Sequence, residues 1–494
     1  MVGLEDVMMK WKWIQWVCVG CAWGVGVVAA GGGEGVETKE EGQEGKNGTE
    51  VLVVDVQEAI AWALEGNRGL AVEKVGVERG KVAAEQAWAG IRNWEVAPVG
   101  SVREGDVASR REVGVEGRWT SSLGTRVYGT AGAKEWDFEE VGTGHTRRSE
   151  VRVGVEQPLL KGFGRLEREE PGVVADEAWR AARRSWERKR SALVVQVVEC
   201  WEAARYQERQ VAADAEQAAR LERLCALAEG RERRGNAGRT EVLRMAWQLG
   251  EARQRVENGR AALEVRLREL ADLMGVGGER RIVLGESPLL EVEPPEEGAA
   301  VEVAWRERPE IRQAEEDVGA ARRGVKVARR GLLPEVSAVA EKAWWGEGDS
   351  WSDAMGGGDG EWVVGVEGRM PLRMADARLE VSDRELAVRA AEGRLELARD
   401  TVALEVRSAL AEWRRAQAAL RLARENRARA EERGELARAL FEAGRGTADA
   451  VSDAETDVSA GALGEAAAER DASVSAYRLL HAMGRLLDTP EELL

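Results

Sequence analysis

The strongest constraint on the fold of this chain is a repeat with a long period. A helical stretch rich in Ala, Arg and Glu runs into a Pro-Leu corner, more helix and a Gly-rich break, and this order occurs twice. The corners are residues 157–164 (QPLLKGFG) and 370–377 (MPLRMADA), and the breaks follow at Gly235 and Gly444. The corner proline and the break are 77 residues apart in the first half and 73 in the second, a difference of about one helical turn. This duplication predicts one structural unit used twice.

The charge of the chain limits its partners. Of the 494 residues 33% are charged, and the formal net charge is −17. A nucleic-acid partner is therefore not expected, because its affinity would come mainly from clustered basic residues. The arginines alternate with Glu and Asp along helical stretches, which is typical of a solvated helix surface. Trp occurs 19 times against three Phe and three Tyr, and nothing in the sequence explains this bias.

The N-terminus carries an export pattern. Two lysines precede an apolar run at residues 13–30, which ends in the small residues VAA of a candidate cleavage site. A CVGC segment ending at Cys21 resembles a bacterial lipoprotein box, in which Cys21 would be lipidated. A retained membrane anchor is a third interpretation, although 18 residues is short for spanning a bilayer. We expect residues 1–30 to be a signal peptide or lipoprotein signal, and residues 31–50 to be a flexible linker.

The rest of the chain is expected to divide into two repeats, residues 51–290 and 301–490, joined by a connector at 291–300. Apolar residues across 53–70 recur at the spacing of a helix. The proline-containing stretch 275–300 between the halves is expected to be irregular.

Each repeat also contains a strand region. The first helix is expected to run to about Trp94 and to end at Pro98, because proline lacks the backbone donor. Alternating patterns predict strands at 96–157, with an exposed loop at 134–146, and again at 334–370. Strand pairs this small cannot bury a core. They must therefore pair with other copies of the chain or enter a membrane.

The helices behind the corners are very long. Residues 171–229 would span about 90 Å and residues 373–443 over about 100 Å. Tip turns are expected at 231–240 and 442–448, each followed by a returning helix. The second long helix contains a heptad seam, which predicts packing against another helix. The seam is Val402, Val406, Ala409, Trp413, Ala416, Leu420 and Ala423.

Two long helical hairpins, strand insertions and a tandem duplication resemble the outer-membrane efflux proteins of the TolC family. The resemblance covers about residues 51–490. Its most specific parts are the corner at 157–164, the start at 58–67 (EAIAWALEGN) and the tip turns. Residues 308–311 (RPEI) are similar to the family's opening of its second half.

The resemblance implies a mainly α protein with a membrane β-barrel part. Each subunit of a homotrimer would give strands to one shared outer-membrane barrel and helices to a long periplasmic α-barrel. Only closed barrels satisfy strand backbones in lipid, which agrees with strand pairs too small to close alone. The protein would be a passive export duct of a tripartite efflux or type I secretion system. It would work without a cofactor, together with a periplasmic adaptor and an inner-membrane pump.

Two further features follow from the resemblance. Strand tryptophans could form belts at the surface of the outer-membrane lipid, although the high Trp content of the whole chain leaves this open. They are Trp119, Trp136, Trp344, Trp345 and Trp362. The channel would close near the periplasmic tip, where Glu435 is the best candidate for a pore constriction, with Glu431 and Glu432 behind it. An ordinary solvated helix face is the alternative.

The tip turns resemble the family's adaptor-docking sites. The family places an acidic residue just before the hydrophobic residue that restarts the helix; Glu241 matches this pattern and Ala450 departs from it. Helix reversal alone would also require glycine and an acid at these turns, and both interpretations can hold. The docking candidates are Gly235, Gly238, Arg239, Glu241, Gly444, Arg445, Gly446 and Thr447.

Other classes of function fit the sequence less well. The two histidines, His145 and His481, lack metal-ligand spacing, and no hydrolase triad appears, so an enzyme is not expected. A periplasmic adaptor normally has one helical hairpin with a β-rich remainder. A membrane-anchored coiled-coil scaffold would explain the heptads but not the strand insertions.

Overall fold

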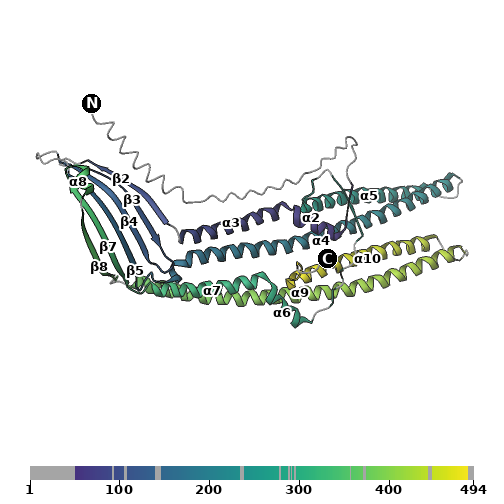
Figure 1. Cartoon of the computed structure of the whole chain (residues 1–494). Coiled ribbons are helices and arrows are strands. Elements are labelled where there is room, and N and C mark those ends of the chain that lie inside the picture. Colours follow the sequence, from purple (N-terminus) through teal and green to yellow (C-terminus); the bar gives the residue numbers. More distant parts are fainter. Residues whose placement is uncertain are drawn as a thin grey trace, which may run out of the picture. The chain divides into compact units, whose positions relative to one another are not determined.

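Long helices and one sheet make up most of the described chain (Figure 1). The computed structural model describes residues 51–91, 94–104, 108–138, 146–233, 239–277, 280–286, 290, 292–293, 296–356, 358–370, 374–442, 445 and 448–487. The helices are α2 (Val56–Gly66), α3 (Arg68–Ile91), α4 (Arg165–Arg233), α5 (Arg239–Met274), α6 (Glu297–Glu307), α7 (Pro309–Arg330), α8 (Trp351–Gly356), α9 (Ala375–Glu442) and α10 (Ala448–Met483). The strands are β1 (Val51–Val54), β2 (Trp94–Arg103), β3 (Ala108–Thr120), β4 (Arg126–Phe138), β5 (Thr146–Pro158), β6 (Arg281–Leu284), β7 (Glu335–Gly348) and β8 (Asp359–Arg369).

The larger sheet combines strands from both halves. Its order is β2-β3-β4-β5-β7-β8, and every neighbouring pair is antiparallel. The first half therefore supplies four strands to the sheet and the second half two, with β5 pairing with β7 across the junction. The exposed loop expected at 134–146 does not begin at residue 134, because β4 continues to Phe138. Residues 139–145 lie outside the described part.

Two proline predictions were wrong. Helix α3 ends at Ile91, and Pro98 lies inside β2 rather than ending a helix. Strand β2 is at the edge of the sheet, where a residue without an N–H costs no ladder bond on the open side. Pro171 does not begin a helix either. It lies inside α4, six residues after Arg165, where it removes one helical hydrogen bond near the helix start.

The corner at 157–164 is a junction of three segments. The backbone N–H of Leu159 donates to the carbonyl of Val336 at 2.7 Å, which ties the corner to the start of β7. The turn between β3 and β4 lies against it, because the N–H of Gly164 donates to the carbonyl of Leu123 at 3.0 Å. A Cβ atom at Gly124 would be only 2.3 Å from the carbonyl oxygen of Gly162. This close approach explains why residue 124 is glycine. Residues 371–373 of the second corner lie outside the described part.

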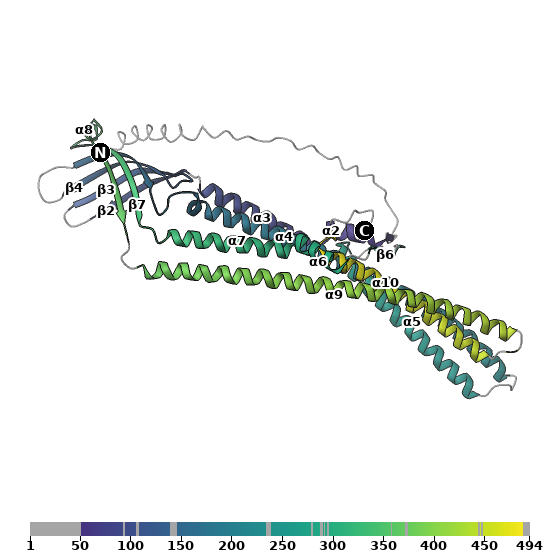
Figure 2. The ribbon, with the colours of Figure 1, turned by 90° about the horizontal axis from the view of Figure 1, so that it is seen from below.

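The long helices pair within each half and pack between halves. Helix α4 packs against α5 and α9 against α10, while α3 lies on α4 and α7 on α9 (Figures 1 and 2). Helix α4 also packs against α7 and α10, which joins the halves. The heptad seam of α9 is confirmed: its residues are buried or partly buried against α6, α7 and α10.

The middle of the described chain contains elements that the sequence did not reveal. The described part begins with β1, which pairs in parallel with β6, and α2 starts only at Val56. Strand β6 and the start of α6 both lie in the stretch 275–300, which was expected to be irregular. The Asp55 carboxylate caps α2 by accepting from the N–H of Glu58 at 2.7 Å. The Glu58 carboxylate in turn accepts from the N–H of Asp55.

Trp201 lies at the centre of this region. It is 0% exposed, and its indole N–H donates to the carbonyl of Val54 at 3.2 Å, which links α4 to β1. The residues packed around it include Val56, Leu270 and Tyr477, from three other helices. Trp201 is therefore the largest fully buried side chain of this core.

We expect Trp201→Ala to destabilise the protein by about 3–5 kcal/mol, because it leaves a large cavity. The carbonyl of Val54 keeps its hydrogen bond from the N–H of Gly285. Thermal and denaturant unfolding would measure this. The matched control is Trp62→Ala, since Trp62 is 42% exposed and should cost about 1 kcal/mol or less. Equal effects of the two substitutions would contradict the assignment of Trp201 to the core.

Candidate transport path

The six-stranded sheet has two chemically different faces. Alternate side chains of a strand point to opposite faces, so directly paired residues share a face. One row across the sheet is Trp94, Trp119, Val127, Val155, Ala340 and Val364. The adjacent row, on the other face, is Glu95, Arg118, Tyr128, Gly154, Glu341 and Val363. We call the first side the apolar face and the second the charged face.

The apolar face is uncovered in the single chain. Val96 and Val113 are each 66% exposed, and Val364 is 78% exposed. Monomeric soluble proteins rarely expose contiguous apolar surface of this kind. The face therefore requires a nonpolar medium or another molecule to cover it.

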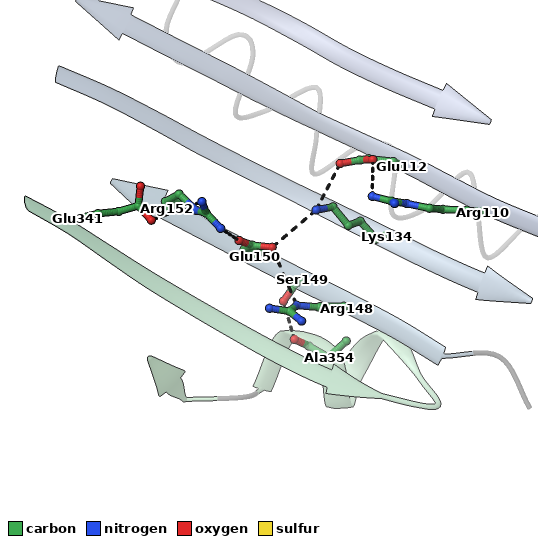
Figure 3. A network of polar contacts seen from close by, with 9 residues as sticks. All are labelled: Arg110, Glu112, Lys134, Arg148, Ser149, Glu150, Arg152, Glu341 and Ala354. Atoms are coloured by element: carbon green, nitrogen blue, oxygen red, sulfur yellow. Dashed lines mark hydrogen bonds and ion pairs between the residues drawn. The ribbon is translucent and has the colours of Figure 1, made fainter. Parts of the chain in front are cut away.

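The charged face carries a network that crosses four strands (Figure 3). Lys134 of β4 lies between Glu112 of β3, at 3.4 Å, and Glu150 of β5, at 3.7 Å. Arg152 contacts Glu150 at 2.5 Å and Glu341 of β7 at 3.4 Å. The outer members are Arg110, which contacts Glu112 at 2.9 Å, and Arg148, which lies 3.9 Å from Glu150. Positive and negative side chains thus alternate from strand to strand.

A tyrosine extends this network across the sheet. The ring of Tyr128 lies over Gly154, where a Cβ atom would be only 2.3 Å from the ring carbon that bears the hydroxyl. Its hydroxyl donates to Glu341 at 2.8 Å. Glycine at 154 is therefore required for the ring to lie flat. Each exposed pair contributes less than about 1 kcal/mol, but the pairs together form a polar wall in which opposite charges compensate.

The network could have been found from the sequence. Charged residues occupy alternate positions at 110, 112, 116 and 118 and again at 148, 150 and 152, and apart from Arg111 the residues between them are valine or small. This is the pattern of a strand with one apolar and one water-facing side. We interpreted the valines as strand signals and did not assign the charges to a shared surface.

The edges of the structure are also apolar. Strands β2 and β8 are the two edges of the sheet. Helices α3 and α9, which flank α4 and α7, expose apolar side chains that pack on no other described helix. On α3 they are Val72, Val75 and Val82, and on α9 they are Leu379, Leu386, Leu397 and Leu404, each 51–70% exposed. Both the sheet and the helical layer therefore end in surfaces suited to another copy of the chain.

A polar joint connects the halves farther along the helices. Arg308, between α6 and α7, contacts Glu405 of α9 at 2.7 Å and Glu310 at 3.1 Å, and donates to the carbonyl of His481 at 3.4 Å. The Nδ1 atom of His481 lies 2.6 Å from the hydroxyl of Ser191 in α4. Burial, followed by the nearby Arg308 guanidinium, lowers the pKa of His481. The RPEI motif thus supplies the arginine of this joint.

The constriction candidates lie near the end of α9. Gly434 is buried, and a Cβ atom there would be 3.0 Å from Val458 of α10, so this side of the helix faces its partner. Glu431, Glu432 and Glu435 are exposed. Glu431 accepts from Arg427 at 2.8 Å, whereas Glu432 and Glu435 have no ion-pair partner among the described residues. The carboxylates of Glu432 and Glu435 are therefore not held by an ion pair within the described residues.

The structure reaches only part of the tip turns. Arg239, at the start of α5, contacts Glu232 at 3.6 Å, and the N–H of Arg445 donates to the carbonyl of Leu440 at 2.9 Å. Glu241 lies in the first turns of α5. The remaining candidates lie outside the described residues, as does Cys21: Gly235, Gly238, Gly444, Gly446 and Thr447.

The described residues contain no group of three or more His, Cys, Asp or Glu side chains that could hold a metal ion. Among the helices within the described ranges, none is both long enough and apolar enough to cross a membrane.

Comparison with known proteins identifies the fold. Residues 300–485 match the family described as Outer membrane efflux protein. The structure is similar to CusC with a TM-score of 0.65 at 16% identity, over 90% of this chain and 95% of that one. It is also similar to VceC of Vibrio cholerae, with a TM-score of 0.62 at 15% identity, over 87% of this chain and 96% of that one. A third similar structure is the CmeC outer membrane channel of Campylobacter jejuni, with a TM-score of 0.65 at 14% identity, over 87% of this chain and 86% of that one. No curated protein sequence matches the chain. The expected combination of long helical hairpins and a strand region is confirmed.

The joint at His481 predicts a dependence of stability on pH. Folding lowers the pKa of this imidazole below its ordinary value of 6.5, so protonation is less favourable in the folded than in the unfolded protein, and stability falls as the pH falls below that value. We expect His481→Asn, which keeps a polar group near Ser191 but cannot be protonated, to show a smaller loss of thermal stability between pH 7.5 and 5.5. The chain has one other histidine, His145, which lies outside the described residues, and His145→Asn serves as the control that should retain the wild-type loss. Identical pH profiles for wild type and His481→Asn would contradict the prediction.

Proposed function

We propose that this chain, a member of the outer membrane efflux protein family, is the outer-membrane channel of a tripartite efflux or type I secretion system. The observation that carries the proposal is the sheet with an exposed apolar face, a charged opposite face and two open edges. In lipid, strand backbones are satisfied only in a closed barrel, with apolar side chains outside and polar side chains inside. The apolar face would then contact lipid and the charged face would line the water-filled lumen.

The channel is a homotrimer in this proposal. One six-stranded sheet leaves the edges of β2 and β8 unpaired, and pairing β8 of one copy with β2 of the next would remove both. In a ring of copies paired in this way, the exposed leucines of α9 in one copy would lie toward the exposed valines of α3 in the next. The open edges of the sheet and the exposed apolar side chains of the helices would therefore be covered by the same adjacent copy, which supports a closed ring of copies.

The helical part would lie in the periplasm and end at the tip turns. There the duct would meet a periplasmic adaptor, which links it to an inner-membrane pump driven by a proton gradient or ATP. The docking residues would be those of the two turns: Gly235, Gly238, Arg239, Glu241, Gly444, Arg445, Gly446 and Thr447. The duct itself would be passive, with no cofactor and no catalytic role.

The termini and domains are assigned in line with this function. Residues 1–30 would direct export as a signal peptide or as a lipoprotein signal with lipidation at Cys21, and residues 31–50 would be a linker. Residues 51–290 and 301–490 would be the two structural repeats, joined at 291–300. The two-fold order of strands, long helix and returning helix supports this division.

Density-gradient fractionation of cells that express the full chain tests the function. We expect recovery with the outer membrane and, after detergent extraction, the mass of a trimer. Recovery with the inner membrane would indicate an anchored scaffold, and a soluble periplasmic protein would indicate an adaptor. Either result would reject the duct.

The carboxylates near the end of α9 are proposed to narrow the pore. Three copies of Glu435 around one axis would favour cations, with Glu431 and Glu432 behind them. In planar bilayers with a salt gradient, we expect Glu435→Ala to move the reversal potential toward zero. The control is Glu264→Ala on α5, an exposed carboxylate already paired with Arg268, which should leave the potential unchanged. An unchanged reversal potential for Glu435→Ala would refute its place at the constriction.

A further inference from the structure

The strands of the six-stranded sheet differ in how they connect to the helices. In chain order, β2 follows α3, α4 follows β5, β7 follows α7, and α9 comes after β8 (Figure 1). Each of these four strands is thus continued by one helix. Strands β3 and β4 instead come between β2 and β5, both along the chain and in the sheet. They form a hairpin inserted into a sheet that otherwise has one strand for each helix.

The inserted hairpin has the same two faces as the rest of the sheet. Val113 and Val115 of β3 lie on the apolar face and are 66% and 47% exposed. On the charged face, Glu112 contacts Lys134 at 3.4 Å, and Lys134 reaches Glu150 of β5 at 3.7 Å. A hairpin folded into a water-filled lumen would expose its valines to water on one side. The hairpin therefore belongs to the wall of the sheet.

The hairpin is also fixed at the corner where the helices begin. The hydroxyl of Thr125, beside the start of β4, donates to the Gln157 side chain at 2.6 Å, and Arg126 contacts Glu156 at 3.3 Å. Farther along β4, the hydroxyl of Tyr128 donates to Glu341 of β7 at 2.8 Å. These contacts hold the hairpin in one position between β2 and β5.

With the hairpin included, the sheet is as wide as the helical layer that continues it. Helices α3, α4, α7 and α9 pack side by side in that order, and at about 8–10 Å between axes they cover about 32–40 Å. Strands about 4.8 Å apart and tilted by about 40° each cover about 6.3 Å of circumference, so six strands cover about 38 Å. Four strands at the same tilt would cover about 25 Å.

We propose that the β3–β4 hairpin sets the width of the channel, which admits compact macromolecules through its sheet segment as well as small molecules. The inference rests on the proposed function, because it requires three copies in one closed barrel. Six strands from each of three copies make a barrel of eighteen strands. At the same spacing and tilt its circumference is about 113 Å and its backbone diameter about 36 Å. Barrels of this strand number leave an aqueous channel.

The width of the lumen limits the size of the cargo. Sheets pack about 10 Å apart, so one layer of side chains takes about 5 Å and the open lumen is about 25 Å wide. Twelve strands at the same tilt would leave about 14 Å. A compact polypeptide of about 50 residues is about 25 Å in diameter, whereas a single α-helix is about 10–12 Å. The hairpin therefore decides whether a small folded polypeptide fits.

Thiol labelling of the full chain on intact cells measures the width. Glu361 of β8 lies on the charged face, in one row with Arg152 midway along the strands. Glu361→Cys is treated from outside with maleimide-linked polymers of increasing diameter, and we expect labelling up to a limit of about 25 Å. In a variant that lacks residues 108–138, β2 pairs with β5 and twelve strands remain, so the limit should fall to about 14 Å.

The matched control is Val364→Cys, on the same strand but on the apolar face, which should stay unlabelled by every polymer because it faces lipid. The chain without an added cysteine gives the background from the native thiols. Equal limits for the full chain and the shortened variant would overturn the inference. If the full chain is absent from the outer membrane, the proposed function fails as well. If it is recovered there as a trimer with a limit near 14 Å, only the inferred width fails.

A second measurement decides the case if the shortened variant does not assemble. Thr130 and Ala131 are adjacent in β4, on the charged and the apolar face respectively. In the full chain, we expect polymers up to the same limit of about 25 Å to label Thr130→Cys and to leave Ala131→Cys unlabelled. Labelling of both or of neither would show that the hairpin is not part of the barrel wall, and would overturn the inference.

Discussion

A sheet with one exposed apolar face and two open edges is not stable in water by itself, and the rest of the structure depends on this constraint. Both edges must pair and the apolar face must be covered. The row from Trp94 to Val364 runs uninterrupted across six strands, so this row is not suited to solvent. The strand region of a single chain is therefore incomplete without something that pairs its edges and covers its apolar face.

The tandem repeat serves this constraint without being symmetrical. The halves contribute four strands and two strands, and β5 pairs with β7 where they meet. Away from the sheet the halves are joined again, by the packing of α4 on α10 and by the contact of Ser191 in α4 with His481 in α10. The two repeats are thus joined both through the sheet and through the helices.

Sequence patterns predicted the features that depend on local periodicity. The heptad seam from Val402 to Ala423 was identified because its spacing reflects direct helix packing. Pro98 was misread, since a proline at a sheet edge and a proline after a helix look the same until the strand order is known. The pairing of β1 with β6 and the contact of Arg308 with Glu405 join residues far apart in the chain. No local pattern records such contacts. The sheet register likewise decides which charges meet on one face.

The corner glycines have a consequence at the opposite end of the molecule. Helix α4 leaves the corner as a rod of 69 residues, which at the rise of an α-helix is about 100 Å long. On such a lever, a change of one degree in the angle of departure displaces the far end by about 2 Å. The contact of Gly124 with Gly162, where not even a methyl group fits, is thus an alignment device. The angular tolerance allowed at this contact therefore limits how accurately the far end of α4 is positioned.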